Sequence, residues 1–167
     1  SERGMQRRKK REEQLYKYLT SVGYAPDRET VVPFCGQGSK KLARIDFLIY
    51  KTDRVVAVEC DERAHDREPV LCEVTRMLDV AAQHRLTSDL PLHFIRFNPD
   101  GYVVDGRAQK PKMAERHREL LLAIEDPLAA PFAITYICYS STAGVADVTR
   151  SDDFPSDLRG SCKTRVA

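Results

Sequence analysis

The sequence predicts an α/β (α+β) fold in which helices flank a central mixed sheet of about four to five strands. Two observations lead to this fold class. Two short β-rich runs, 45–50 and 55–61, are joined by a polar stretch that is short enough for a hairpin turn. A helical pattern over residues 70–86 then leads into an apolar strand at 92–97. A strand–helix–strand crossover of this length indicates a parallel pair of strands.

The chain has 167 residues, which is enough for one domain with a real core. We expect one domain over residues 1–139 and a partly irregular C-terminal extension over 140–167. The net charge is only +2, so the total charge does not indicate a nucleic-acid partner. The distribution of the charges along the chain is more informative. No apolar stretch is long enough to cross a bilayer, and we expect no membrane partner.

Residues 5–22 predict a helix, because Leu15, Tyr18, Leu19 and Val22 recur at helical spacing. A dense basic run lies on its first turns and suits phosphate contact, although a solvated face or a localisation signal explains it equally well. The run consists of Arg7, Arg8, Lys9, Lys10 and Arg11.

A further strand is predicted over residues 30–34, before the two runs of the hairpin. It is followed by a Gly-rich loop and the pair Lys40 and Lys41. This loop lacks the Gly-Lys-Ser/Thr ending of a nucleotide-binding loop. We interpret it as a hairpin tip that lies along a nucleic-acid backbone.

Three carboxylates are expected to meet at the central hairpin. Glu59 and Asp61 share one face of their strand, because residues two apart point the same way. In the usual hairpin register Asp46, at the start of the partner strand, lies close to both. Such a group of hard oxygen ligands suits Mg²⁺, and His65 follows in a loop. Acids at strand ends are also common as purely structural residues.

The helix over 70–86 presents an apolar stripe that includes Val74, Met77 and Leu78, with Arg76 on another face. We interpret Cys72 as a small core residue. On the following strand, Arg96 should project from the face opposite to Phe97.

A further helix is predicted over 112–124, with Arg116 exposed, followed by a strand over 132–139. From residue 140 the periodicity is lost, and we expect the last dozen residues to be loose. His84 and His93 have no metal-ligand partners at suitable spacing and are expected to be surface or structural residues.

Five cysteines without paired spacing, and a basic N-terminus without an apolar segment after it, predict reduced thiols in an intracellular protein. The basic run permits a nuclear address without establishing one.

These motifs together resemble a known family. Arg44-x-Asp46-Phe47, followed by an apolar strand that ends Glu59-x-Asp61-x-x-x-His65, is similar to the very-short-patch-repair branch of the PD-(D/E)XK restriction-endonuclease superfamily, with its EDxHD-like relatives. The likeness extends to Cys72-Glu73-x-x-Arg76-Met77 and to residues 94–100, and covers roughly residues 10–105.

The resemblance implies a restriction-endonuclease-like nuclease domain and a Mg²⁺-dependent deoxyribonuclease that cuts phosphodiester bonds inside DNA, with RNA not excluded. Asp46 would hold Mg²⁺, or Mn²⁺ in its place, with Glu59, Asp61 or a backbone carbonyl assisting. The family's usual Lys is replaced here by Asp61, and the related branch relies on a histidine instead. His65 is therefore the expected general base or acid.

The resemblance also implies an acid on the first helix that faces the active site, which selects Glu12, with Glu13 as the fallback and a plain surface role as the alternative. Arg76 would bind the scissile phosphate or hold a carboxylate in an ion pair. Arg44 and Arg96 are further candidate contacts to nucleic acid, and the alternative for Arg44 is that it merely flanks a strand.

Glu62 stands where relatives often have Gly, and this extra carboxylate either joins the metal shell or repels the phosphate. Two other hypotheses therefore remain. The chain is a weak or inactive nuclease-fold module that positions nucleic acid for a larger protein, or an unrelated α/β protein whose acids are structural.

Overall fold

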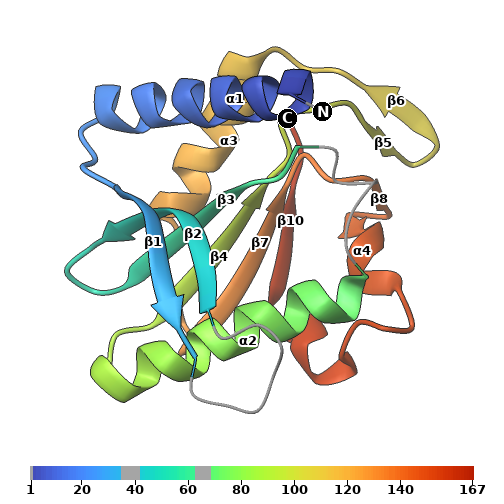
Figure 1. Cartoon of the computed structure of the whole chain (residues 1–167). Coiled ribbons are helices and arrows are strands. Elements are labelled where there is room, and N and C mark those ends of the chain that lie inside the picture. Colours follow the sequence, from blue (N-terminus) through green and yellow to red (C-terminus); the bar gives the residue numbers. More distant parts are fainter. Residues whose placement is uncertain (1, 35–41, 63–68) are drawn as a thin grey trace.

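A computed structural model describes residues 2–34, 42–62 and 69–167 of the chain. At its centre is a mixed sheet of six strands in the order β1-β2-β3-β4-β7-β10 (Figure 1). The predicted α/β class is confirmed, although the sheet has more strands than we expected. The strands of this sheet are β1 (Asp27–Pro33), β2 (Leu42–Tyr50), β3 (Val55–Cys60), β4 (Leu92–Phe97), β7 (Phe132–Ile137) and β10 (Cys162–Arg165).

The predicted hairpin and crossover are both present. β2 and β3 are antiparallel, and Lys51 N–H donates to the Arg54 carbonyl across the turn between them (2.9 Å). β3 and β4 are parallel, as are β4 and β7. The principal helices lie at the predicted places: α1 (Glu2–Ser21), α2 (Val70–Thr87) and α3 (Met113–Glu125).

Helices cover both faces of the sheet, which gives the molecule two apolar layers. Val74, Met77 and Val80 of α2 pack on one face against Ala57 and its neighbours. The other face packs against two helices, α1 and α3, through the side chains of Leu15, Leu19, Leu120, Ala123 and Ile124. Figure 1 shows α1 and α3 together on the side of the sheet away from α2.

Strand β2 changes the face that its residues present at Asp46. Ile45 packs in the layer under α2, whereas Phe47 packs in the layer under α1 and α3. Regular alternation would place residues two apart on the same face. Glu29, which lies opposite Asp46 in the register of β1 and β2, has a positive φ of 48°. The backbone of both strands is therefore irregular beside this carboxylate.

The last residues are not loose, and that expectation is wrong. β10 pairs in parallel with β7 as the edge strand of the main sheet. Phe154, in the segment that precedes β10, is 2% exposed and packs in the layer under α2. Residues 140–167 therefore share the core of the preceding residues and do not form a separate extension.

Between the main elements lies a smaller four-stranded sheet that the sequence did not indicate. It has the order β6-β5-β8-β9. Its strands are β5 (Tyr102–Val104), β6 (Arg107–Gln109), β8 (Ser141–Thr142) and β9 (Val145–Ala146), followed by the short helices α4 (Asp147–Arg150) and η1 (Ser156–Ser161).

Three expectations about burial are wrong. Arg116 is 2% exposed, because it lies one turn before Leu120 on the buried stripe of α3. Its guanidinium donates to the carbonyls of Asn98 and Asp100, which makes burial tolerable. Cys72 and Leu78 are exposed instead of packing in the core.

The four cysteines of the described residues are free. No helix within residues 2–34, 42–62 and 69–167 is long and apolar enough to span a membrane.

Candidate acidic site

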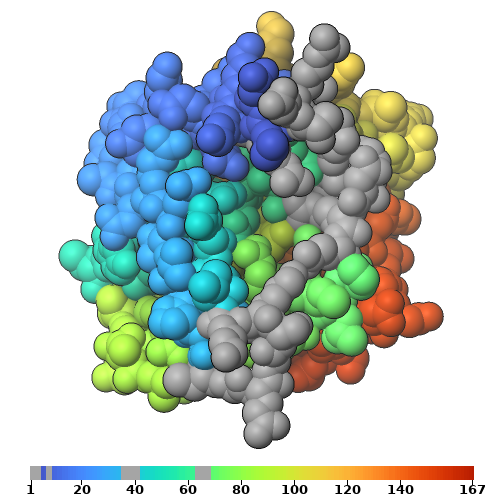
Figure 2. Space-filling model, in the orientation of Figure 1, coloured from blue at the N-terminus to red at the C-terminus, as the bar shows by residue number. Residues whose placement is uncertain are grey.

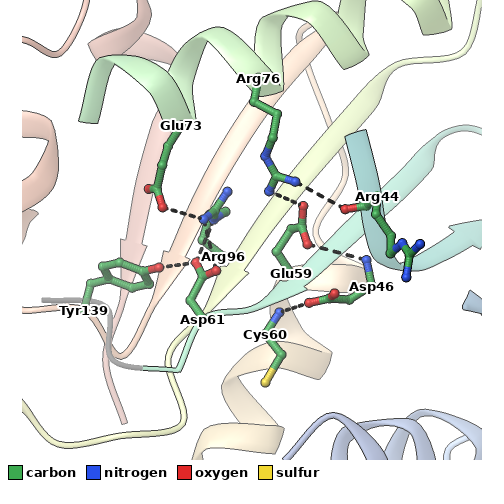
Figure 3. A network of polar contacts seen from close by, with 9 residues as sticks. All are labelled: Arg44, Asp46, Glu59, Cys60, Asp61, Glu73, Arg76, Arg96 and Tyr139. Atoms are coloured by element: carbon green, nitrogen blue, oxygen red, sulfur yellow. Dashed lines mark hydrogen bonds and ion pairs between the residues drawn. The ribbon is translucent and has the colours of Figure 1, made fainter. Parts of the chain in front are cut away.

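Asp46 and Glu59 meet across the β2–β3 pair (Figure 3). The Asp46 backbone N–H points to Glu59 Oε2 (3.5 Å), and Asp46 Oδ2 accepts a hydrogen bond from the Cys60 backbone N–H (2.8 Å). The hairpin register predicted this approach. Asp46, however, lies in the middle of β2 and not at its start.

Glu59 is held by an arginine of α2. Arg76 Nη2 lies 2.6 Å from Glu59 Oε1, and Arg76 Nη1 donates to the Arg44 carbonyl (3.2 Å). The Glu59 side chain is 5% exposed, against 28% for Arg76. Of the two roles left open for Arg76, the geometry fits the carboxylate-holding one. Arg44 is itself exposed, and its side chain remains a candidate for phosphate contact.

Asp61 belongs to a second, more deeply buried pair. Arg96 donates from Nε to Asp61 Oδ2 (2.6 Å) and from Nη2 to Oδ1 (3.0 Å). The Tyr139 hydroxyl also donates to Asp61 Oδ2, and Glu73 Oε1 lies 3.4 Å from Arg96 Nη2. Arg96 projects opposite to Phe97, as predicted, but its side chain is only 3% exposed. A guanidinium buried in this way has no access to a nucleic-acid backbone, which corrects its expected role.

The predicted cluster of three metal-binding carboxylates therefore separates into two parts. Both oxygens of Asp61 are engaged by Arg96, so Asp61 is poorly placed to act as a ligand. In the part of the chain that the structure describes, no group of three His, Cys, Asp or Glu side chains is arranged to hold a metal ion. Asp46 and Glu59 remain as an adjacent pair.

Burial shifts the titration of this pair. It raises the pKa of Asp46 to about 6, helped by the negative charges of Glu12 and Asp61 and opposed by the hydrogen bond from Cys60. Burial raises the pKa of Glu59 to about 7, although Arg76 and Arg96 oppose that shift. Burial therefore favours the protonated form of both carboxyl groups, and a bound cation would favour their ionised form.

Glu12 rather than Glu13 faces the acidic site. Glu12 acts electrostatically on both Asp46 and the Cys60 thiol, and its charge raises the pKa of each. Glu13 instead forms an exposed ion pair with Arg28 (3.1 Å) on the outer side of α1. Of these two neighbours, Glu12 is the one whose charge acts on Asp46, so Glu12 stays the candidate and its role in catalysis stays a prediction. In Figure 2 parts of the central strands remain visible between α1 (dark blue) and α2 (green).

The basic run is part of α1. Lys9 and Lys10 are exposed, whereas Arg11 is half-buried and donates to Gln14. Arg7 and Arg8 lie on the same helix. His65, Lys40 and Lys41 fall outside the described residues, and their expected roles stay predictions.

Sequence reasoning missed the partners of Asp61. Tyr139 comes from the chain after β7 and is 78 positions away, so no local pattern pointed to it. Arg96 left a better signal. The parallel pairing of β3 with β4 places Arg96 directly opposite Glu59, within two residues of Asp61. Once the pairing and register of the two strands are known, Arg96 is expected near these acids, but the sequence alone does not give that register.

The comparisons with known proteins add little to this geometry. No protein-family model and no curated protein matches the chain. A solved crystal structure of a protein of unknown function, AF1548, aligns with 89% of this chain at 10% identity and a TM-score of 0.35. The alignment spans 62% of that protein's length. A likeness at this level assigns no family, and the α/β fold class stands on the six-stranded sheet itself.

Proposed function

We propose that the protein is a metal-dependent endonuclease that hydrolyses phosphodiester bonds in DNA. The observation that carries the proposal is the buried Asp46–Glu59 pair with Glu12 close to it. The two carboxylates supply oxygen ligands of the kind that a divalent cation prefers, Glu12 adds negative charge near Asp46, and Arg76 pairs with Glu59 alone. The resemblance in sequence to the very-short-patch-repair branch supports the same reaction.

The chemistry of the donor set fits Mg²⁺ in part. Asp46 and Glu59 supply hard carboxylate oxygens, and a bound cation would offset the cost that burial imposes on their ionised forms. When bound, Mg²⁺ supplies positive charge at the phosphate and makes water more acidic. Asp46 would be the principal ligand, Glu59 the second, and Glu12 would add charge from α1. Asp61 is left out of the ligand set because Arg96 holds it.

The chain's own residues account for the rest of the expected reaction. Arg76 orients Glu59, and the Cys60 backbone N–H orients Asp46. His65 remains the proposed general base or acid, which would accept a proton from the attacking water or return one to the leaving oxygen. The phosphodiester bond breaks as the bond from water to phosphorus forms.

A second candidate function is favoured by a different observation. The predicted catalytic acids at the end of β3 and just after it are held by arginines, through Glu59–Arg76 and Asp61–Arg96. A nuclease fold whose carboxylates are neutralised in this way would bind and position nucleic acid without cutting it. It would serve as a module of a larger assembly.

Cleavage of labelled single-stranded, duplex and branched DNA with Mg²⁺, Mn²⁺ or EDTA distinguishes the two functions. We expect metal-dependent cutting that Asp46→Ala and His65→Ala abolish. Glu12→Gln should reduce cutting, whereas its matched control, Glu13→Gln on the same helix, should not. Metal-independent DNA binding without cutting by the unmodified protein would support the positioning module instead.

A further inference from the structure

A basic groove lies at the far edge of the sheet from the acidic site. It has a volume of about 690 Å³ and is formed by β9, α4, η1 and β10. Figure 1 shows α4 and β8 beyond β10, on the side of the sheet opposite to β1. Four cationic side chains line the groove: Arg150, Arg159, Lys163 and Arg165. The other described lining residues include no carboxylate.

The charges of these four side chains are not equally available. Arg165 is committed to Glu119 (3.0 Å) and Asp126 (3.3 Å), which lie outside the groove lining. Arg150, Arg159 and Lys163 are exposed and have no carboxylate partner among the described residues. Three positive charges therefore line one groove with no described carboxylate at ion-pair distance, an arrangement that can attract an anion.

The two arginines are held in place without being neutralised. Arg150 Nη2 donates to the Thr142 carbonyl (2.7 Å). Arg159 donates from Nε to the Thr149 carbonyl (2.9 Å) and from Nη2 to the Ser151 carbonyl (3.2 Å). A guanidinium has five N–H donors, so each arginine retains donors for a ligand. Guanidinium groups that are already held in this way lose little side-chain freedom when they bind two oxygens of a phosphate.

We propose that this groove binds the phosphate backbone of a nucleic acid whose cleaved part lies at the acidic site, an inference that rests on the proposed function. The strand order separates β2, which carries Asp46, from β10 by four strand spacings, or about 19 Å across the sheet. At about 3.4 Å per nucleotide step, a strand that occupies both places extends about six steps from the cleavage point.

The test measures DNA affinity against salt in EDTA, with duplexes of two lengths. Each duplex carries a marked central position. In the short duplex three base pairs separate this position from the end, and in the long duplex twelve base pairs do. The groove variant is Arg150→Gln/Arg159→Gln/Lys163→Gln. The matched control removes the same kinds of charge from exposed positions outside the groove, through Arg85→Gln/Lys110→Gln/Arg118→Gln.

We expect the long duplex to lose affinity in the groove variant by about tenfold or more, and the slope of log K against log salt to decrease by about 2–3. The control variant and the short duplex should show a smaller change. Equal slopes for the groove and control variants would overturn the proposal. So would inorganic phosphate binding in the groove that long DNA does not displace, since that identifies a small-anion site.

Two readouts keep the result interpretable. Lys163→Glu alters one exposed side chain that belongs to neither apolar layer, so its effect on the slope tests the groove even if the triple variant folds poorly. Cleavage of the short duplex should be the same in the groove variant and the unmodified protein. If the salt slope of DNA binding changes in the groove variant but the unmodified protein cuts no DNA, the groove is retained as a DNA-binding site and the proposed nuclease activity is rejected.

Discussion

Arg76 and Glu59 form an ion pair of 2.6 Å that joins helix α2 to strand β3. The carboxylate is buried, whereas the guanidinium is half-buried and keeps part of its contact with water. Glu59 still titrates with a pKa of about 7, because burial outweighs the attraction of the two nearby arginines. Removing either partner therefore has consequences that depend on pH.

Arg76→Met should lower the free energy of unfolding by about 2–3 kcal/mol at pH 8, because it leaves a buried carboxylate without its cation. At pH 5 the loss should be smaller, since Glu59 is then protonated. Urea denaturation at both pH values measures this difference. In the double variant Glu59→Gln/Arg76→Met most of the pH 8 loss should be recovered, and equal losses at the two pH values would contradict the ion-pair explanation.

Asp46 and Glu59 should make the protein less stable as the pH rises. Their pKa values are raised on folding to about 6 and about 7, so the folded chain holds protons that the unfolded chain has released. Between about pH 4 and pH 7 this contribution to the free energy of unfolding falls with increasing pH. Asp46→Asn should reduce that fall and raise the melting temperature at pH 8.

The same carboxylates should link stability to Mg²⁺. At pH 8 a bound divalent cation stabilises the folded state by mass action, so millimolar Mg²⁺ should raise the melting temperature of the unmodified protein. In Asp46→Asn the increase should disappear, whereas Glu13→Gln should keep it. An increase of the same size in all three proteins would place the ion elsewhere.

Asp61 and Arg96 should behave as a buried structural pair. Asp61→Asn or Arg96→Met alone should destabilise the protein by about 3–5 kcal/mol, since each leaves a buried charge without its main partner. The double variant should lose much less than the sum of the two. Chemical denaturation of the four proteins gives the coupling energy, and additive losses would show that the two residues act independently.

His93 and His117 should stay neutral in mildly acidic solution. Burial lowers the pKa of each to about 4, and His93 lies within hydrogen-bond distance of Thr135 while His117 stacks on Tyr18. Their ring proton shifts in NMR spectra should remain constant from pH 7.5 to pH 5. A histidine in the unfolded chain titrates near 6.5, so a transition in that range would contradict burial of the ring.

Phe154→Ala should lower the free energy of unfolding by about 3 kcal/mol or more, because a fully buried aromatic side chain leaves a cavity. Phe154 is 2% exposed and packs in the same layer as α2. Thermal denaturation should show one cooperative transition at a lower temperature. A value unchanged from the unmodified protein would mean that the residues after 139 do fold apart from the main sheet.

Local pattern was sufficient for most elements of the fold. The helix over 70–87 has an apolar stripe at helical spacing, and the strand over 92–97 is a short, mostly apolar run that ends at a turn, so their bounds were predicted within a residue. β10 was not predictable in this way. It is only four residues long, and it is a strand because the exposed edge of β7 pairs with it.

The candidate site was predictable in Asp46, Glu59 and Arg76 but not in the pairing of Asp61 with Arg96. The hairpin register brings Asp46 to Glu59 through a short turn, which is a local relationship. Asp61 and Arg96 are 35 positions apart and meet through the parallel pairing of two strands. A sequence pattern gives the type of each strand but not which charges oppose one another across the sheet, and so Arg96 was mistaken for a nucleic-acid contact.

The change of face at Asp46 restricts how the length of this chain can vary. Ile45 belongs to one apolar layer and Phe47 to the other, so inserting or deleting a single residue in β2 would turn one of the two layers toward the wrong side. Length can change freely only in the connections between strands. A lengthened or shortened connection would alter what the protein touches at its surface while Asp46 keeps its place beside Glu59.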